Sequence, residues 1–490
     1  MKHLRLSFFV KNAIIENDSI CVYKIRRSDR LISCRKRQKG ERSMGFPTFW
    51  GGVHPPQNKD LTRDKRIEPY LPKSDLAFPM SQHIGAPNAP VVARGDKVKV
   101  GTPLGSADAF VSAPVLSSVS GTVKDVGPRQ TVPGTFDTCV VVENDGLYEK
   151  DERWAPLPDY ENCDPKEYLK RIREAGIVGF GGATFPAAVK FAPPPQDKIK
   201  WFIVNGAECE PYLNCDFRLM MESTDEIVKG TALLLRLFPE AEGVIAVENN
   251  KPEAIAALSG SVARLGVQNV RVQPLTVKYP QGSEKMLIEA LTGQEYVVTA
   301  LPADVGCIIA NVRTVQQCWR AIALGEPSTE RVVTVTGDAI AEPKNVCIPL
   351  GTSIRELVDF CGGFKEAPVK VLAGGPMMGM SMRSLDVPAV KGTSGVLALT
   401  ARSTMLRRAT ACLHCGRCVE ACPMGLVPSA LDTLVLGKEY DRFEAEGGMN
   451  CIECGSCTYV CPACRPLTQS CRDGKSFVMA QRKKRKAAGK

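Results

Sequence analysis

The chain has 490 residues, of which 44% are hydrophobic and 24% are charged, with a formal net charge of +10 at pH 7. This composition indicates a soluble globular protein with several domains. No apolar stretch approaches the ~18 residues that a membrane-spanning helix needs, so any membrane association is expected to go through partners or a surface.

The positive charge is concentrated at the two ends. Residues 1–43 carry a net charge of +8 and residues 481–490 one of +6, which leaves −4 for the body. We expect 1–43 to be a basic disordered extension, because charges interrupt its apolar run and no cleavage site of a signal peptide follows. Residues 476–490 are interpreted as a basic tail. Solvated tails are favoured over attraction to anionic lipid or RNA, and no nucleic-acid partner is predicted.

Residues 44–150 have the pattern of a small β-rich domain. The segments 93–105 and 111–127 alternate valine with polar residues and place glycine at turn positions, which predicts short strands. They resemble the barrel-sandwich fold of biotinyl and lipoyl domains, which present a modified lysine between their two halves. The intervening residues here, SADAF at 106–110, include no lysine, so a structural role is expected.

Residues 151–328 alternate predicted strands with predicted helices. The strand runs are 200–206, 242–250 and 269–279, and the helical runs are 223–238, 251–266 and 283–293. Ser223 and Glu226 have the spacing of a capping box, Pro252 begins a helix and Gly266 ends it. Strand–helix units in series predict a parallel, Rossmann-like sheet.

Residues 329–400 predict a different unit. Strand patterns at 330–339 and 344–351 precede a helix at 353–364 and a strand at 369–379. This is a small α+β unit of about the size of a β-grasp domain, and a cysteine-rich segment of short helices and loops is expected to follow it at 401–475.

Cysteine is used unevenly along the chain. Ten of the 20 cysteines lie between residues 412 and 471. Without a secretory signal this clustering predicts a metal site rather than disulfides. The ferredoxin spacing C-x2-C-x2-C-x3-C-P occurs twice, whereas zinc sites usually pair two C-x2-C knuckles without a third cysteine. The eight cysteines in this spacing are Cys412, Cys415, Cys418, Cys422, Cys451, Cys454, Cys457 and Cys461.

The spacing also predicts how the two sets share ligands. Three thiolates two residues apart can hold three corners of an iron–sulfur cube, and the fourth cysteine reaches the other cube. We therefore assign one [4Fe–4S] cluster to Cys412, Cys415, Cys418 and Cys461, and the second to Cys422, Cys451, Cys454 and Cys457. His414 is expected to be a surface or packing residue, and Cys464 and Cys471 plain thiols.

A glycine-rich loop occupies residues 176–191, GIVGFGGATFPAAVKF. It follows a helical pattern rather than a strand, so it is not an ordinary dinucleotide fingerprint. Four glycines within seven residues, an expected helix and Lys190 predict a phosphate-binding loop, with a structural turn as the alternative.

This loop resembles the flavin loop of the NADH-oxidising flavoprotein subunit of respiratory complex I. The motifs NGAECEP at 205–211, YPQGSEKML at 279–287 and IIANVRT at 308–314 resemble that family in the same order. FWGGVHPPQNK, GGPMMG and the doubled cysteine motif make the chain more similar to the C-subunit of ion-translocating electron-transport complexes of the Rnf or Rsx type. The resemblance covers residues 44–475.

The resemblance implies a flavin and nicotinamide site in which Glu208 and Glu284 are catalytic. The residues that it implies for cofactor binding are Gly179, Gly181, Gly182, Phe185, Lys190, Asn205, Glu208, Glu210, Gly282, Glu284 and Asn311. Three positions depart from the complex I pattern, namely Ala207, Ser283 and Ala310. These departures remove charge and hydrogen bonds from the flavin surroundings.

The function implied is that of an electron-entry subunit. NADH would reduce FMN, and two [4Fe–4S] clusters would pass electrons to membrane subunits that move Na+ or H+ and exchange electrons with ferredoxin. The expected location is peripheral, on the cytoplasmic face of a cell membrane. The alternatives are a soluble NADH-linked flavoprotein of a bifurcating hydrogenase or dehydrogenase, and a non-enzymatic iron–sulfur subunit without flavin.

Overall fold

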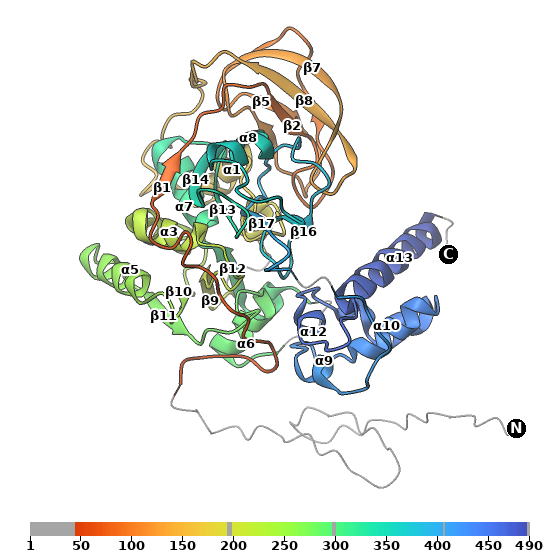
Figure 1. Ribbon diagram of the computed structural model, residues 1–490. Coiled ribbons are helices and arrows are strands. Elements are labelled where there is room, and N and C mark those ends of the chain that lie inside the picture. Colours follow the sequence, from red (N-terminus) through yellow and green to blue (C-terminus); the bar gives the residue numbers. More distant parts are fainter. Residues whose placement is uncertain (1–44, 194–197, 296–299, 405–406, 488–490) are drawn as a thin grey trace, which may run out of the picture. The chain divides into compact units, whose positions relative to one another are not determined.

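The computed structural model describes residues 45–193, 198–295, 300–404 and 407–487. The predicted extension at 1–43 lies outside the described residues. From Phe46 onward the described chain forms four sheets, which are followed by a carboxyl-terminal group of helices (Figure 1).

The first two sheets are antiparallel and share one core. Their strand orders are β2-β8-β7-β4 and β3-β5-β6, and both contribute residues to one cluster, among them Phe78, Leu104 and Val140. Gly121 begins β7 with φ +149°, and a Cβ there would lie 1.9 Å from the carbonyl oxygen of Glu143. The strands are β2 (Leu76–Pro79), β3 (Ala89–Pro90), β4 (Lys97–Val98), β5 (Pro103–Ser106), β6 (Val115–Leu116), β7 (Gly121–Gln130) and β8 (Phe136–Asn144).

The next sheet is entirely parallel, with strand order β11-β10-β9-β12. Its strands are β9 (Trp201–Gly206), β10 (Glu242–Glu248), β11 (Val270–Leu275) and β12 (Cys307–Asn311). The helical segments around it are α1 (Lys166–Glu174), α2 (Ala187–Lys190), α3 (Cys215–Glu222), α4 (Thr224–Leu235), α5 (Pro252–Arg264), α6 (Glu284–Thr292), η2 (Pro302–Val305), α7 (Val312–Trp319) and η3 (Arg320–Leu324).

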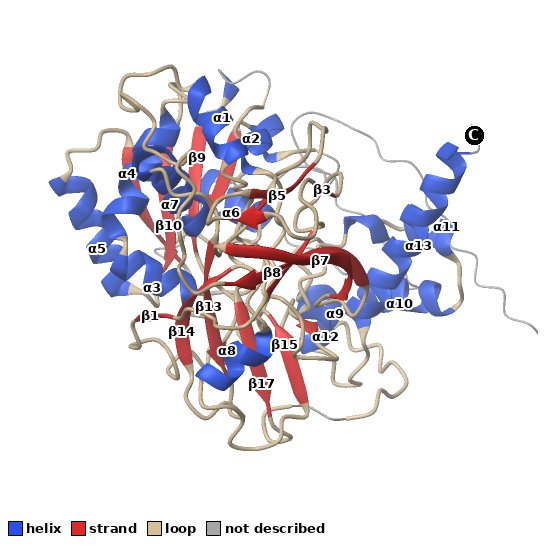
Figure 2. Cartoon of the chain, turned by 90° about the horizontal axis from the view of Figure 1, so that it is seen from above, coloured by secondary structure: helices blue, strands red, loops and turns tan. Residues whose placement is uncertain are grey.

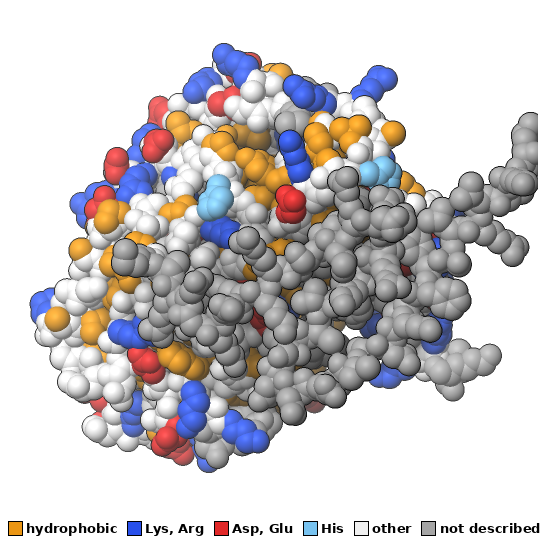
Figure 3. Space-filling view, turned by 90° about the horizontal axis from the view of Figure 1, so that it is seen from below, with side chains coloured by type: hydrophobic (Ala, Val, Ile, Leu, Met, Phe, Trp, Pro, Cys, Tyr) orange, Lys and Arg blue, Asp and Glu red, His pale blue; other side chains and the backbone are white. Residues whose placement is uncertain are grey.

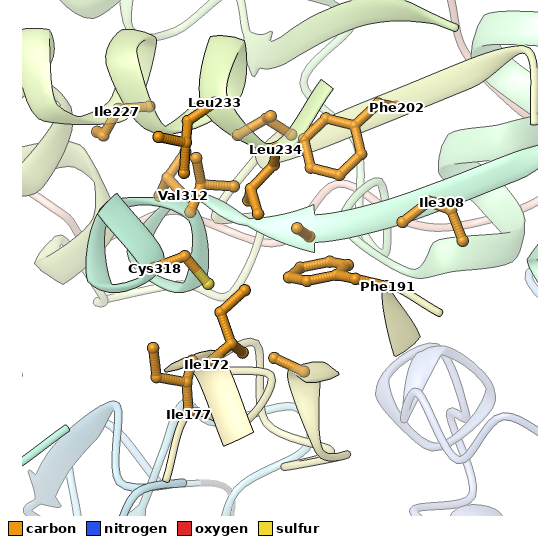
Figure 4. Packing of buried hydrophobic residues seen from close by; sticks show 14 of the residues in the cluster. Ile172, Ile177, Phe191, Phe202, Ile227, Leu233, Leu234, Ile308, Val312 and Cys318 are labelled. Carbon is orange, nitrogen blue, oxygen red and sulfur yellow. The ribbon is translucent and has the colours of Figure 1, made fainter. Parts of the chain in front are cut away.

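Successive side chains along the parallel strands point to opposite faces of the sheet, and each face packs against its own hydrophobic cluster. Phe202 and Ile308 face a large cluster that includes Leu234, whereas Ile203 faces a smaller one formed with Leu287 of α6. Figure 4 shows Phe202, Leu234 and Ile308 in the larger cluster, between helix and strand. The sequence predicted β9, β10, β11, α4, α5 and α6 from this periodicity.

The predicted capping box of α4 is wrong. Ser223 precedes the helix but accepts no capping hydrogen bond through its side chain. The carboxylate of Glu226 instead accepts hydrogen bonds from Gln316 and Arg320, on the neighbouring helical segments α7 and η3. Glu226 therefore makes a tertiary contact instead of the helix-capping contact that the local sequence pattern predicted.

The fourth sheet is mixed, with order β1-β14-β13-β17-β15-β16. Its first strand, β1 (Ile67–Pro69), comes from before the barrel-sandwich strands and pairs with β14, a pairing that the predicted domain division did not include. The other elements are β13 (Glu330–Thr336), β14 (Lys344–Pro349), α8 (Ile354–Phe360), β15 (Lys370–Ala373), β16 (Met380–Ser381) and β17 (Gly395–Leu399).

The carboxyl-terminal region is helical and contains both cysteine motifs (Figure 2). Its helices pack around Leu434, Phe443 and Val478. The last helix runs through the predicted start of the basic tail at residue 476. The elements are α9 (Arg417–Glu420), α10 (Pro428–Leu436), α11 (Tyr440–Ala445), η4 (Gly448–Asn450), α12 (Ser456–Tyr459) and α13 (Leu467–Ala487).

Candidate functional site

The parallel sheet places two of the predicted residues side by side. The strand order changes direction between β9 and β12, and ligands of open parallel sheets bind at the carboxyl ends of strands at such a point. Asn205 and Asn311 are paired residues at these two strand ends. The sheet topology alone therefore creates a candidate binding position at this pair of asparagines.

The glycine-rich loop lies beside this position. Gly181 approaches Asn311 so closely that a Cβ on the glycine would lie 3.6 Å from the asparagine Cβ. The loop closes on itself, because the Gly179 amide donates to the Phe185 carbonyl at 2.8 Å. The predicted helix that follows the loop is one short turn, α2, which ends at the predicted Lys190.

The top of this loop is open. Gly181, Gly182 and Ala183 are exposed, and no described residue accepts a hydrogen bond from their three amides. Below them, the amide of Phe180 donates to Thr314 Oγ1, and its carbonyl accepts from the buried guanidinium of Arg331. The lower part of the loop is held in place by these hydrogen bonds, and three consecutive amides above it have no partner among the described residues. Such an arrangement fits the phosphate or ring of a flavin.

Asn205 connects the loop at 205–211 with the segment at 279–287. Its side-chain amide donates to the Gly282 carbonyl at 2.8 Å, and its oxygen accepts from the Ala207 amide at 3.1 Å. Cys209 Sγ accepts a hydrogen bond from the Gly282 amide at 3.3 Å. Both segments predicted to contribute to the site are thus held together at the end of β9.

Lys190 and Glu284 form an ion pair across the site. Lys190 ends α2 and Glu284 begins α6, so the pair joins the end of the glycine-rich segment to the 279–287 segment. The Glu284 side chain is 44% exposed, which leaves it accessible to a ligand. The two residues predicted for phosphate binding and for catalysis therefore neutralise each other in this structure.

Glu208 lies beneath the site rather than on its surface. Its side chain is 4% exposed, and its carboxylate accepts hydrogen bonds from the amides of Asp216 and Phe217 at the start of α3. Burial raises the pKa of Glu208 to about 7, although Lys59, 3.7 Å away, opposes the shift. The carboxylate can therefore exchange a proton near neutral pH, but it has little surface to offer a ligand.

Asp216 joins this buried group and was not predicted. Its carboxylate accepts a hydrogen bond from the side chain of Asn311 at 2.6 Å, while Asn311 also caps α7 through the Arg313 amide. Burial raises the pKa of Asp216 as well. Asp216 reaches the site only because α3 packs beneath the sheet end, so no local pattern marked it.

Glu210 points away from the glycine-rich loop. Its carboxylate accepts hydrogen bonds from the amides of Met377 and Met378, at 3.2 and 2.9 Å, in the turn of the motif GGPMMG. Tyr279 lies 3.4 Å from the same carboxylate and donates to the Cys454 carbonyl at 2.7 Å. Glu210 therefore links the 205–211 loop to the cysteine region, whereas the resemblance had placed it in the flavin pocket.

The eight motif cysteines line two cavities. We call the cavity lined by Cys422, Cys451, Cys454 and Cys457 the inner cavity, and the one lined by Cys412, Cys415, Cys418 and Cys461 the outer cavity. Each takes three cysteines from one motif and the fourth from the other, as the spacing had predicted. A cavity lined by four thiols of this origin fits a [4Fe–4S] cluster.

The two cavities adjoin at the start of α13. Leu467 lines the outer cavity and Thr468 the inner one, and Leu467 packs in one cluster with Cys418 and Cys457. The inner cavity is the more buried, because three of its four cysteines are buried, whereas the outer cavity has one buried and one exposed cysteine, Cys418 and Cys415.

An apolar cluster connects the inner cavity to the sheet end. It contains Tyr279, Ala421 and Cys454, and Cys209 of the 205–211 loop packs against it. Gly51 also packs closely on Cys422 of this cavity, because a Cβ there would lie 3.1 Å from the Cys422 carbonyl oxygen. The inner cavity is thus packed against the 205–211 loop, which begins at Asn205 of the candidate flavin site.

Four family matches follow this architecture along the chain. They are the RnfC barrel sandwich hybrid domain at residues 47–147, the Nuo51 FMN-binding domain at 172–320, the SLBB domain at 332–381 and the 4Fe–4S dicluster domain at 404–462. The FMN-binding match spans the glycine-rich loop and both asparagines, and the dicluster match spans all eight motif cysteines.

Curated relatives match most of the chain. The C-subunit of the proton-translocating ferredoxin:NAD+ oxidoreductase complex of Clostridium ljungdahlii is 46% identical over 83% of this chain and 88% of that protein. The Na+-translocating counterpart from Acetobacterium woodii is 42% identical over 89% and 98%. The C-subunit of the ion-translocating oxidoreductase complex of Rhodobacter capsulatus is 40% identical over 89% and 84%.

Proposed function

The chain belongs to the family of C-subunits of ion-translocating oxidoreductase complexes, and from this premise we propose that it is the component through which electrons enter such a complex from NADH. The proposal combines an FMN site at the ends of β9 and β12 with two [4Fe–4S] clusters in the two cysteine cavities. Their electrons would be exchanged with ferredoxin through other subunits, which couple the flow to movement of Na+ or H+.

The observation that carries this proposal is the apolar contact between the 205–211 loop, which begins at Asn205 of the candidate flavin site, and the inner cavity. Cys209 of the loop, Tyr279 and Cys454 belong to one packed cluster, and a hydrogen bond from Tyr279 joins it to the Cys454 backbone. A site for a two-electron donor is therefore packed directly against a site for a one-electron carrier. This arrangement supports electron transfer from flavin to the inner cluster and then to the outer one.

The chain's own residues would hold FMN in the following way. The amides of Gly181, Gly182 and Ala183 would bind its anionic or ring oxygens, and Asn205 and Asn311 would fix the end of the sheet against it. Lys190 would exchange part of its pairing with Glu284 for the flavin phosphate. When bound, FMN would accept a hydride from NADH and release the two electrons one at a time.

Glu208 and Asp216 would hold a proton beneath the flavin. Both carboxyls are buried, and burial raises the pKa of each, so at neutral pH the pair can retain a proton that an exposed carboxylate would lose. Asn311 connects Asp216 to the glycine-rich loop. We assign these carboxyls a supporting role, whereas Glu284 is accessible enough to contact nicotinamide.

The outer cavity is the proposed exit. Cys415 and the neighbouring Leu413 are exposed, the latter by 65%, so a partner can approach the outer cluster closely. The described residues contain no helix long and apolar enough to cross a bilayer. Where Figure 3 leaves the lower face visible, it carries charged side chains of both signs among small hydrophobic areas. We propose attachment at the cytoplasmic face of a membrane through other subunits of the complex.

Finer features of the fold belong to the same proposal. The sheet formed by β13 to β17 with α8 is interpreted as a β-grasp unit, the parallel sheet as Rossmann-like and the helices around the cysteines as ferredoxin-like. The parallel sheet would then supply the FMN site, and the ferredoxin-like helices would supply both clusters.

Anaerobic purification tests the proposal. We expect about one FMN and about eight iron atoms per chain, as two four-iron clusters require, and bleaching of the cluster absorption when NADH is added. Gly181→Val should abolish FMN binding while iron is retained, because its side chain would fill the open loop. Gly260→Ala, at an open position on α5, is the matched control. Clusters that stay oxidised after NADH addition, in a preparation that retains FMN, would contradict the proposal.

A further inference from the structure

The inner cavity contains polar side chains that neither cysteine motif requires. Ser456 Oγ lies 3.4 Å from Cys454 Sγ, and Thr468 Oγ1 lies 3.6 Å from Cys457 Sγ. Cys471 packs against Cys451 in the lining of the same cavity. Three of the four cysteines of this cavity therefore have a side-chain partner. Cys471, expected from the sequence to be a plain thiol, is one of these partners.

Burial leaves these three partners no access to bulk water. Ser456 is 0%, Cys471 1% and Thr468 9% exposed, and all three line the cavity. A buried hydroxyl or thiol must find an acceptor within the protein. When the neighbouring cysteines are thiolates bound to iron, their sulfur atoms are acceptors only, so the three side chains become the donors.

The neighbouring Thr458 can set the direction of the hydrogen bond between Thr468 and Cys457. The Thr468 amide donates to Thr458 Oγ1 at 2.9 Å, and the two threonine hydroxyls lie 2.8 Å apart. If the Thr458 hydroxyl donates to Thr468 Oγ1, the Thr468 proton is left for Cys457 Sγ. The pair of threonines thus forms a chain of donors that ends on a ligand of the inner cavity.

The outer cavity has no such set. Both motifs place a backbone donor at the same position, from the His414 amide to Cys412 Sγ at 3.4 Å and from the Glu453 amide to Cys451 Sγ at 3.3 Å. Beyond these amides, no side chain in the described part of the chain donates to a cysteine of the outer cavity. Its Cys415 is exposed, so water can reach the sulfur atoms.

We propose that Ser456, Thr468 and Cys471 donate hydrogen bonds to the ligands of the inner cluster and raise its reduction potential. The proposal rests on the assignment of a [4Fe–4S] cluster to the inner cavity. Reduction adds one electron, and therefore one negative charge, to a cluster with four thiolates. A buried site of low polarity disfavours that charge, and donors to the sulfur atoms offset the effect. The three residues are positioning residues, because they act through the ligands.

The consequence is that the two clusters are made reducible by different means. Water would stabilise the added charge at the outer cluster, whereas fixed hydroxyl and thiol groups would do so at the inner one. An inner cluster without these donors would be a poor acceptor for the flavin next to it.

A redox titration monitored by electron paramagnetic resonance tests whether the three donors raise the reduction potential of the inner cluster. Dithionite supplies the electrons through mediators, so neither NADH nor FMN takes part, and a failure here is separate from a failure of the proposed function. Cys454→Ser and Cys415→Ser identify the signals of the inner and outer clusters. In the variant S456A/T468V/C471A, we expect the equilibrium constant for reduction of the inner cluster to fall about tenfold, which is about 59 mV for one electron.

The controls separate tuning from simple disruption. Ser429→Ala removes a hydroxyl that lines the outer cavity without a hydrogen bond to a cysteine, and should leave both potentials unchanged. If Cys471→Ala loses iron, Cys471→Ser should restore the iron together with the wild-type potential. Unchanged inner potentials in the triple variant, an equal shift of both clusters, or a serine variant that regains iron at a lowered potential would each overturn the proposal.

Discussion

The inner and outer cavities share one spacing of cysteines but differ in burial and in the side chains next to the cysteines. The inner cavity is packed against Tyr279 and the 205–211 loop and is lined by buried donors, whereas the outer cavity opens to solvent at Cys415. The motif therefore determines which thiols meet, and the surrounding fold determines what each site can do. One cavity suits electron uptake inside the protein and the other suits delivery to a partner.

Removal of a ligand should separate the two roles most strongly. Serine is a poor iron ligand, so Cys454→Ser should disrupt the inner cluster and slow NADH-driven reduction of the outer cluster by more than about 100-fold, since even changes beyond the ligands cost 10–100-fold. Cys415→Ser should leave reduction of the inner cluster by NADH near its normal rate. Stopped-flow absorbance and rapid-freeze resonance spectra measure both rates. Equal effects of the two variants would remove the distinction between the cavities.

Exposure should make the clusters differ in resistance to oxidants. Oxidation of sulfur ligands follows their accessibility, so we expect iron to be released by ferricyanide in two phases that differ about tenfold in rate. The fast phase should come from the outer cluster, and Cys415→Ser should be the variant that changes it. A single phase, or a fast phase that is altered by Cys454→Ser alone, would contradict the assignment of the inner cavity as the protected one.

The link between the 205–211 loop and the inner cavity should depend on Glu210. Glu210→Ala leaves the partly buried amide of Met377 and the exposed amide of Met378 without their carboxylate acceptor, and we expect a loss of about 1.5–3 kcal/mol in the free energy of unfolding, as for hydrogen bonds to a charged group. Reduction of the inner cluster by NADH should slow as well. The exposed Glu342→Ala is the control, expected within about 0.5 kcal/mol of wild type. A Glu210 variant as stable as this control would show that the link contributes little.

The last prediction concerns the pH dependence that Glu208 gives to the stability of the fold. Its pKa of about 7 lies above the ordinary value of 4.5, so the folded state binds the proton more tightly than the unfolded state. This contribution to stability is complete below about pH 4.5 and is lost as the pH rises towards 7. The loss is on the order of 3 kcal/mol. Glu208→Gln should flatten this dependence in urea unfolding at several pH values, whereas the exposed Glu253→Gln should not. A parallel decline in wild type and Glu208→Gln would place the titration elsewhere.

Local patterns predicted much of the scaffold and the ligand sets. Alternating valines marked strands such as β7, helical periodicity marked α4 to α6, and the spacing of the cysteines predicted which thiols share a cavity. These features depend on neighbours in sequence, which is why they could be predicted. The pairing of β1 with β14 joins residues far apart in sequence and could not.

The sequence did not predict where the side chains of the site point. Glu208 and Glu210 stand two residues apart in one motif, yet one caps α3 and the other binds the turn at Met377 and Met378. Asp216 and Cys471 belong to no recognisable motif. They reach the flavin site and the inner cavity only because α3 and α13 place them there. The positive φ of Glu208, +46°, turns the chain between the two glutamates in a way that composition does not reveal.

The order of reduction of the two clusters tests the central claim most directly. An anaerobic, FMN-containing preparation would be mixed with NADH and frozen at successive times, with the signals assigned through Cys454→Ser and Cys415→Ser. The packing of the 205–211 loop with Tyr279 and Cys454 predicts that the inner signal rises first and the outer signal follows it. An outer cluster that is reduced first, or that is reduced at the normal rate when the inner cluster is missing, would contradict the account.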